Sequence, residues 1–98
     1  MSHRAIVFKA VCKPEHREAF IARAQRHAAI VRSEPGCLRC DVLVPDEAHG
    51  NTIYLYELFE DEHALKVHSE MPYMPEWRED ITPMVESREP TFVIVTND

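Results

Sequence analysis

Apolar and polar residues alternate along four segments of the chain, and such alternation predicts β-strands. The segments are Arg4–Cys12, Cys37–Val44, Thr52–Phe59 and Pro90–Thr96. The first and last are apolar on both faces, which predicts burial on both sides of a sheet. The two middle segments are joined by a short polar connector and are therefore expected to form a hairpin.

Three further segments carry apolar residues at helical spacing. The longest, about Pro14 to Ser33, has one apolar stripe that includes a histidine: Phe20, Ala24, His27, Ala28, Ile30 and Val31. His27 is therefore expected to face the core. The helix is expected to end at Glu34-Pro35-Gly36, where proline cannot continue it and Gly36 can take a positive φ.

Two shorter helices are expected in the second half of the chain. Asp61 is a plausible N-cap for the first of them, which Met71-Pro72 ends and which places His68 on its apolar side. The second covers about Pro75 to Ser87 and is expected to kink or restart at Pro83. Its apolar stripe is expected to be core that lines part of any pocket: Met74, Trp77, Ile81, Met84 and Val85.

The predicted order β-α-β-β-α-α-β is that of a ferredoxin-like α+β fold, with four antiparallel strands and the helices on one face. Its 98 residues are expected to form one domain, residues 1–98. Such a sheet needs a cover on its other face. We therefore expect a homodimer that packs sheet to sheet, with Tyr54 and Tyr56 on the dimer side.

The net charge is −6, and the eleven basic residues are scattered. This balance disfavours nucleic acid and anionic membranes as partners, because both require clustered Lys and Arg. The sequence also lacks an export signal and any membrane-spanning segment, so a cytoplasmic location is expected.

The three cysteines, Cys12, Cys37 and Cys40, are expected to be reduced thiols. Cys37 and Cys40 match the spacing C-x-x-C. A redox motif would need a helix N-terminus at this point, and a zinc site would need a second pair of ligands. Neither is predicted, so a redox or metal role is disfavoured.

The residue with the clearest chemical signal is Glu57. Alternation along Ile53, Leu55, Glu57 and Phe59 places its carboxyl group on an otherwise apolar face. Burial raises the pKa of a carboxyl group unless a cation or hydrogen bonds offset it. Such a group could take a proton from a phenol or from a carbon beside a carbonyl. The alternative is a structural glutamate paired with an arginine or with backbone N–H groups.

His68 follows nine residues after Phe59 and is expected to point into the same interior space. It could orient a substrate oxygen or carry a proton near neutral pH, whereas the simpler alternative is a satisfied core histidine. For His27, the alternative of a satisfied core histidine is favoured more strongly than it is for His68. A metal site formed by His27, Glu57 and His68 is a minor option, because no H-x-x-x-H spacing supports it. No signal attaches to the other histidines, His3, His16, His49 and His63.

Four short segments resemble the antibiotic biosynthesis monooxygenase superfamily: Glu34-Pro35-Gly36-Cys37, Tyr56-Glu57-Leu58-Phe59, Ala64-Leu65-Lys66-Val67-His68 and Met71-Pro72-Tyr73. The resemblance implies a dimeric α+β barrel with a pocket between helices and sheet in each protomer. It implies functional positions at Glu57, His68 and, less firmly, His27. The chain departs from the family pattern at Met71, where a threonine usually precedes the proline. Trp77 alone does not supply the residue set of the haem-degrading members.

The expected function is a monooxygenase that oxidises a small hydroxylated aromatic or quinol-type substrate without metal or flavin. One alternative is an isomerase of a small (phospho)hydroxy-ketone, of the autoinducer-2-processing type. Its substrate would need a cation at the pocket mouth, for which Arg23, Arg26 and Lys66 are candidates. The other alternative is a non-catalytic ligand-binding dimer.

Overall fold

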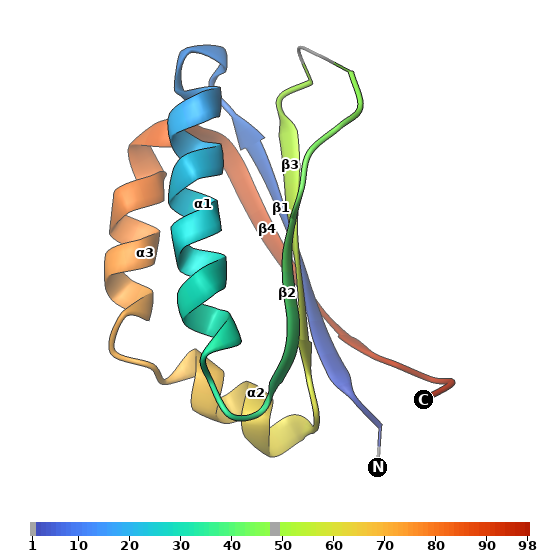
Figure 1. The fold of residues 1–98 in the computed structure, drawn as a ribbon. Helices are drawn as coiled ribbons and strands as arrows, with labels where there is room; N and C mark the ends of the chain where they lie inside the picture. The colour runs from blue at the N-terminus through green and yellow to red at the C-terminus, as the bar shows by residue number, and fades with distance from the viewer. Residues whose placement is uncertain (1, 48–49) are drawn as a thin grey trace.

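The computed structural model describes residues 2–47 and 50–98, so His49 lies outside the described residues. The elements follow one another in the predicted order (Figure 1). They are β1 (Arg4–Cys12), a 3-10 turn (Pro14–His16), α1 (Arg17–Arg32), β2 (Cys37–Leu43), β3 (Thr52–Phe59), α2 (Glu62–Ser69), α3 (Met74–Ile81), a second 3-10 turn (Thr82–Met84) and β4 (Val85–Ile94).

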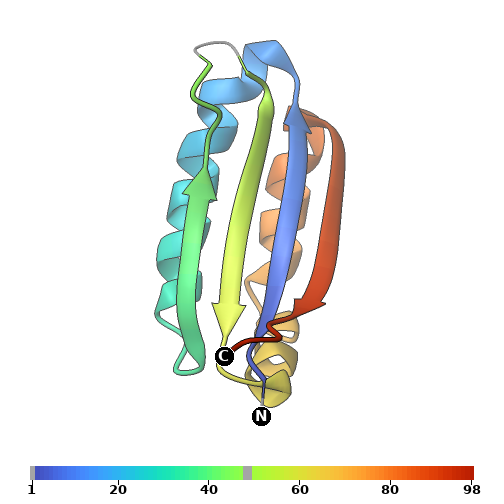
Figure 2. The same ribbon diagram turned by 90° about the vertical axis from the view of Figure 1, so that its right-hand side faces the viewer.

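The four strands form one antiparallel sheet in the order β2-β3-β1-β4. All three α-helices lie against one face of this sheet, and the opposite face is open (Figures 1 and 2). The predicted ferredoxin-like α+β fold is thereby confirmed. The register of β1 against its two neighbours places Glu57, Ile6 and Phe92 in one row across the covered face.

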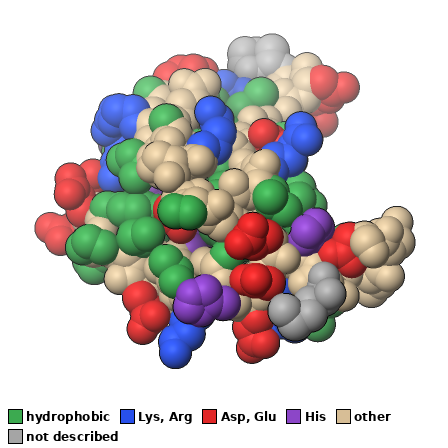
Figure 3. All heavy atoms as spheres, turned by 60° about the horizontal axis from the view of Figure 1, so that its bottom comes forward, with side chains coloured by type: hydrophobic (Ala, Val, Ile, Leu, Met, Phe, Trp, Pro, Cys, Tyr) green, Lys and Arg blue, Asp and Glu red, His purple; other side chains and the backbone are tan. Residues whose placement is uncertain are grey.

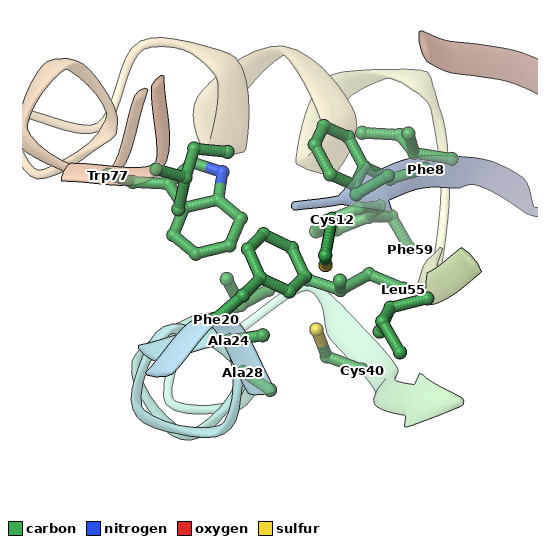
Figure 4. Packing of buried hydrophobic residues seen from close by; sticks show 14 of the residues in the cluster. Phe8, Cys12, Phe20, Ala24, Ala28, Cys40, Leu55, Phe59 and Trp77 are labelled. Carbon is green, nitrogen blue, oxygen red and sulfur yellow. The ribbon is translucent and has the colours of Figure 1, made fainter. Parts of the chain in front are cut away.

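The core lies between α1, α3 and the covered face of the sheet. Phe20, Ala24 and Ala28 of α1 point toward the sheet, where Leu55 and Cys40 meet them (Figure 4). The small alanines allow the helix to approach the strands closely, and the larger rings fill the space beside them. The apolar alternation predicted for β3 is correct, because Ile53, Leu55, Glu57 and Phe59 are all buried.

The prediction for the last helix and strand is wrong in its boundary. The helix ends at Ile81, and Val85–Ser87, expected to be helical, already belong to β4. The reason is Pro83, which cannot donate a backbone hydrogen bond and so interrupts the helix. The following residues then pair with β1, with Ser87 opposite Val11.

Two smaller expectations also fail, those for Ile30 and Gly36. Ile30 is 43% exposed, while Arg23 of the same helix is buried. Leu38 is exposed because the register of β2 shifts between Cys37 and Arg39. Gly36 does not take a positive φ.

Gly36 is instead required by a close approach of two segments. A Cβ atom at this position would lie 2.3 Å from the Cβ atom of Ala64 in α2. The carbonyl of Gly36 accepts a hydrogen bond of 2.9 Å from the backbone N–H of Glu60. The turn after α1 is therefore clamped against the start of α2.

The open face of the sheet carries apolar side chains, among them the exposed Leu43 and Tyr54. This is the face on which a second copy is predicted to pack. On the face of the molecule that carries α2, acidic, basic and histidine side chains are interspersed (Figure 3). Within the described residues, no helix is long and apolar enough to cross a membrane.

Candidate functional site

A cavity of about 230 Å³ lies between α2, α3 and the covered face of the sheet. Glu57, His68 and His27 all line it, so the structure brings the three predicted residues together. Most of the remaining wall is apolar, and it also contains two arginines. The other lining residues are Ile6, Phe8, Ser69, Met74, Trp77, Arg78, Ile81, Arg88, Pro90 and Phe92.

The carboxyl group of Glu57 is almost fully enclosed. The residue is 4% exposed and projects from the middle of β3. Burial, together with the nearby charge of Glu34, raises its pKa from 4.5 to about 8. Within the described residues its Oε1 atom has no hydrogen-bond partner. Among the described residues, the side chain within ion-pair distance of Glu57 is His68 and not an arginine.

His68 reaches the cavity from α2, whose N-terminus is capped by Asp61. The Asp61 side chain accepts a hydrogen bond of 2.8 Å from the backbone N–H of Ala64, as predicted. The His68 side chain is 1% exposed, and its Nε2 atom lies 3.4 Å from Oε1 of Glu57. This contact does not meet the geometry of a hydrogen bond, and neither atom has another hydrogen-bond partner within the described residues.

The other ring nitrogen of His68 is held by a residue that the sequence did not single out as functional. Nδ1 lies 3.0 Å from Oε2 of Glu34, and the same oxygen accepts a hydrogen bond from the Tyr73 hydroxyl. A carboxylate only accepts hydrogen bonds, so this contact places the proton of a neutral ring on Nδ1. The lone pair of Nε2 then faces Glu57.

Glu34 reaches His68 because of the turn in which it lies. It lies two residues after the end of α1 at Arg32, and the close approach of Gly36 to Ala64 holds this turn against α2. The acidic residue in the Glu34-Pro35-Gly36 sequence was the available signal. That segment predicts the end of the helix, but it does not indicate which residue the Glu34 side chain contacts.

His27 forms a flat part of the cavity wall. Its ring stacks on the indole of Trp77 with 4.0 Å between centroids and 7° between planes. Burial, with smaller effects from His68 and Arg23, lowers its pKa from 6.5 to about 3. His27 is therefore neutral in the physiological range and offers a stacking surface and not a cation.

The cations expected at the pocket mouth are elsewhere. Arg23 forms an ion pair of 2.9 Å with Asp80 and lies over the Trp77 ring. Arg26 is absent from the lining residues, and Lys66 lines a separate surface hollow. Arg78 and Arg88, which the sequence did not indicate, line the cavity instead.

The cysteines are free thiols, and burial raises the pKa of Cys12 to about 11. Burial likewise raises the pKa values of Cys37 and Cys40, which disfavours their reactive thiolate forms. Across residues 2–47 and 50–98, no group of three or more His, Cys, Asp or Glu side chains is arranged to hold a metal ion.

The arrangement is suited to moving one proton. Glu57 is poised near neutral pH, and its neighbour His68 has a fixed ring that can accept or return that proton. Glu34 and Tyr73 hold the ring from behind. These groups are buried beside a mostly apolar wall, and a low local dielectric strengthens their mutual interactions.

Comparison with known proteins gives a consistent result. The family model described as antibiotic biosynthesis monooxygenase matches residues 3–80. The protein sll1783 of Synechocystis is 36% identical over 67 residues, which are 68% of this chain and 45% of that protein. This chain thus spans less than half the length of that relative.

Two solved structures have the same fold. A candidate antibiotic biosynthesis monooxygenase from Nitrosomonas europaea is 21% identical, with a TM-score of 0.85 over 97% of this chain and 91% of that one. Rv0793 from Mycobacterium tuberculosis is 21% identical, with a TM-score of 0.86 over 99% and 98%. The family match covers most of the chain, and the chain belongs to the antibiotic biosynthesis monooxygenase family.

Proposed function

We propose that the protein is a cofactor-independent monooxygenase of a small hydroxylated aromatic, and that Glu57 is its general base. The observation that carries the proposal is the enclosed pair formed by Glu57 and His68, 3.4 Å apart at the wall of an apolar cavity. A base with a pKa near the working pH is ionised to a useful extent and is still basic enough to accept a proton from the substrate.

The reaction balances without a reductant. Glu57 takes a hydroxyl proton from a quinol, and the electron-rich ring then attacks O₂ at a ring carbon. One oxygen atom forms the new C–O bond as the ring C–H bond breaks, and the other leaves as water. The product is a hydroxyquinone, and the substrate supplies all four electrons. His68 holds the substrate oxygen and returns the proton through Nε2.

The flat stack of His27 on Trp77 supports an aromatic substrate, because a planar ring can lie along it. The buried phenyl ring of Phe8 extends the same apolar wall. The low pKa of His27, about 3, also makes it too weak a base to compete with Glu57. In this proposal His27 is a binding residue, and Glu34 positions His68.

Oxygen uptake with 1,4-dihydroxybenzene, followed by mass spectrometry after reaction under ¹⁸O₂, tests the proposal. We expect one labelled oxygen atom in the product, and loss of uptake in Glu57→Gln and His68→Ala. The matched controls are Glu60→Gln and His63→Ala, which change exposed residues of the same types. Undiminished turnover in both cavity variants would show the site assignment to be wrong.

Two other outcomes identify the alternatives. Proton exchange at a hydroxy-ketone without oxygen uptake would identify an isomerase that uses the same groups. Saturable binding without any turnover would identify a ligand-binding protein.

We further propose that two copies pack through the open face of the sheet. Tyr54 and Leu43 are exposed there in a single chain, and their burial would stabilise a dimer. Sedimentation is expected to show a dimer for the native chain and a monomer for Tyr54→Lys. A native monomer at all accessible concentrations would contradict this.

A further inference from the structure

Two neighbouring arginines line the cavity. Arg78 belongs to the last turn of α3, and Arg88 lies in β4. Nη1 of Arg88 donates a hydrogen bond of 3.0 Å to the backbone carbonyl of Arg78. This bond ties the strand to the helix end and holds the Arg88 guanidinium beside the cavity.

The arginines lie at the end of the cavity remote from Glu57. Glu57 shares a row with Phe92 across the sheet, whereas Arg88 lies opposite Ala10, four residues back along β4. Strand geometry puts Arg88 about 13 Å along the sheet and about 10 Å across it from Glu57. One elongated ligand could therefore contact the base with one end and the arginines with the other.

The charge of these arginines is unopposed. Arg4, Arg17, Arg23 and Arg39 each form an ion pair with an acidic side chain. Within the described residues, neither Arg78 nor Arg88 does so. Of the other lining residues, His27 is neutral at physiological pH, and the raised pKa of Glu57 keeps most of that carboxyl group uncharged at pH 7.

The result is a positively charged cavity mouth in a protein whose net charge is −6. An acidic protein repels anions overall, so an anionic ligand needs a local cationic entrance. A guanidinium group matches the planar geometry of a carboxylate and can donate two parallel hydrogen bonds to it.

We propose that the cavity selects a hydroxylated aromatic carboxylate, with the carboxylate held by Arg78 and Arg88 and the hydroxyl directed toward Glu57. The inference rests on the proposed function only for the orientation of the hydroxyl end. The preference for an anion stands on the two arginines alone.

Anaerobic calorimetry with two matched probes tests the preference, because turnover is prevented when oxygen is absent. The probes are 2,5-dihydroxybenzoate and 1,4-dihydroxybenzene, which differ only in the carboxylate. We expect tighter binding of the benzoate. Arg78→Gln and Arg88→Gln should each weaken it roughly five-fold and leave the neutral probe unchanged, a size typical of partly exposed charge pairs.

Arg26→Gln is the control, since Arg26 is exposed on α1 and does not line the cavity. It should bind both probes as the native protein does. Added salt should weaken the binding of 2,5-dihydroxybenzoate but not that of 1,4-dihydroxybenzene.

Equal affinity of the native protein for the two probes would overturn the inference, as would equal weakening of both probes in the arginine variants. Failure to bind the benzoate at millimolar concentration would overturn it as well. A preserved benzoate preference without oxygen uptake would leave the inference standing and refute the monooxygenase proposal. Oxygen uptake without a preference for the anion would support the monooxygenase proposal and overturn the inference about the arginines.

Discussion

The two ends of the cavity are built in different ways. At the inner end, Glu57, His68 and Glu34 are buried and joined by short contacts that originate in three separate elements. At the outer end, Arg78 and Arg88 are exposed. The inner end can fix the position of a proton, while the outer end can adjust to different ligands at little cost to the fold.

The largest expected effect comes from Glu57→Gln at the inner end. Removal of a general base should lower kcat by roughly 10²- to 10⁴-fold. In the native protein, oxygen uptake should rise as pH increases through about 8, because Glu57 acts as a base only when ionised. An unchanged pH profile in the variant would contradict this role.

The same substitution should stabilise the fold, and more so at high pH. Between pH 4.5 and about 8 the unfolded chain ionises Glu57 while the folded chain does not. The native protein therefore loses stability as pH rises across this range, by at most about 1.4 kcal/mol per pH unit. Thermal unfolding at pH 5 and pH 8 should show a larger gain for the variant at pH 8.

Glu34→Gln should have the next largest effect. The amide keeps the size of the side chain but no longer requires a proton on Nδ1 of His68, so we expect kcat to fall by roughly ten-fold. The ¹⁵N shifts of the His68 ring should show a changed tautomer. Tyr73→Phe removes the second contact to Glu34 and should have a smaller effect on both measurements.

Gly36→Ala tests the clamp that delivers Glu34. The added methyl group would overlap the Cβ atom of Ala64, and such overpacking costs about 1–3 kcal/mol. Chemical denaturation should show this loss, and Ala64→Gly should restore part of it in the double variant. Simple additivity of the two single losses would argue against a direct clash.

The smallest effect is expected at Phe92, an exposed residue of β4 on the cavity wall. Phe92→Ala should change the free energy of unfolding by less than about 0.5 kcal/mol, because the ring is 62% exposed. Phe59→Ala, by contrast, removes a fully buried ring and should cost about 3–5 kcal/mol. Denaturant titrations of the two variants compare an exposed ring with a buried one, and a large loss at Phe92 would contradict the distinction.

The inner end could be predicted from the sequence in part. Strand alternation gave the orientation of Glu57 and helical spacing gave that of His68, since both depend on local periodicity. The position of Glu34 depends on how a turn packs against a distant helix, which periodicity does not encode. Its contacts with His68 and Tyr73 join residues 34 and 39 positions apart.

The outer end escaped prediction for a related reason. β4 was expected to begin at Pro90, which left Arg88 in no strand, whereas pairing with β1 draws Val85–Ser87 into the sheet. Arg78 is an exposed helix residue, and only the tertiary arrangement brings it to the cavity. Arg23, Arg26 and Lys66 have the required charge, but the tertiary arrangement places them away from the cavity lining.

The stack of His27 on Trp77 gives the protein an optical probe of its own. Trp77 is the only tryptophan of the chain, and its indole lines the cavity. The ultraviolet emission of the protein therefore originates at the cavity wall, beside an imidazole that stays uncharged down to about pH 3. Ligand binding in the cavity can therefore be followed by the wavelength and intensity of Trp77 fluorescence, without a label and without turnover.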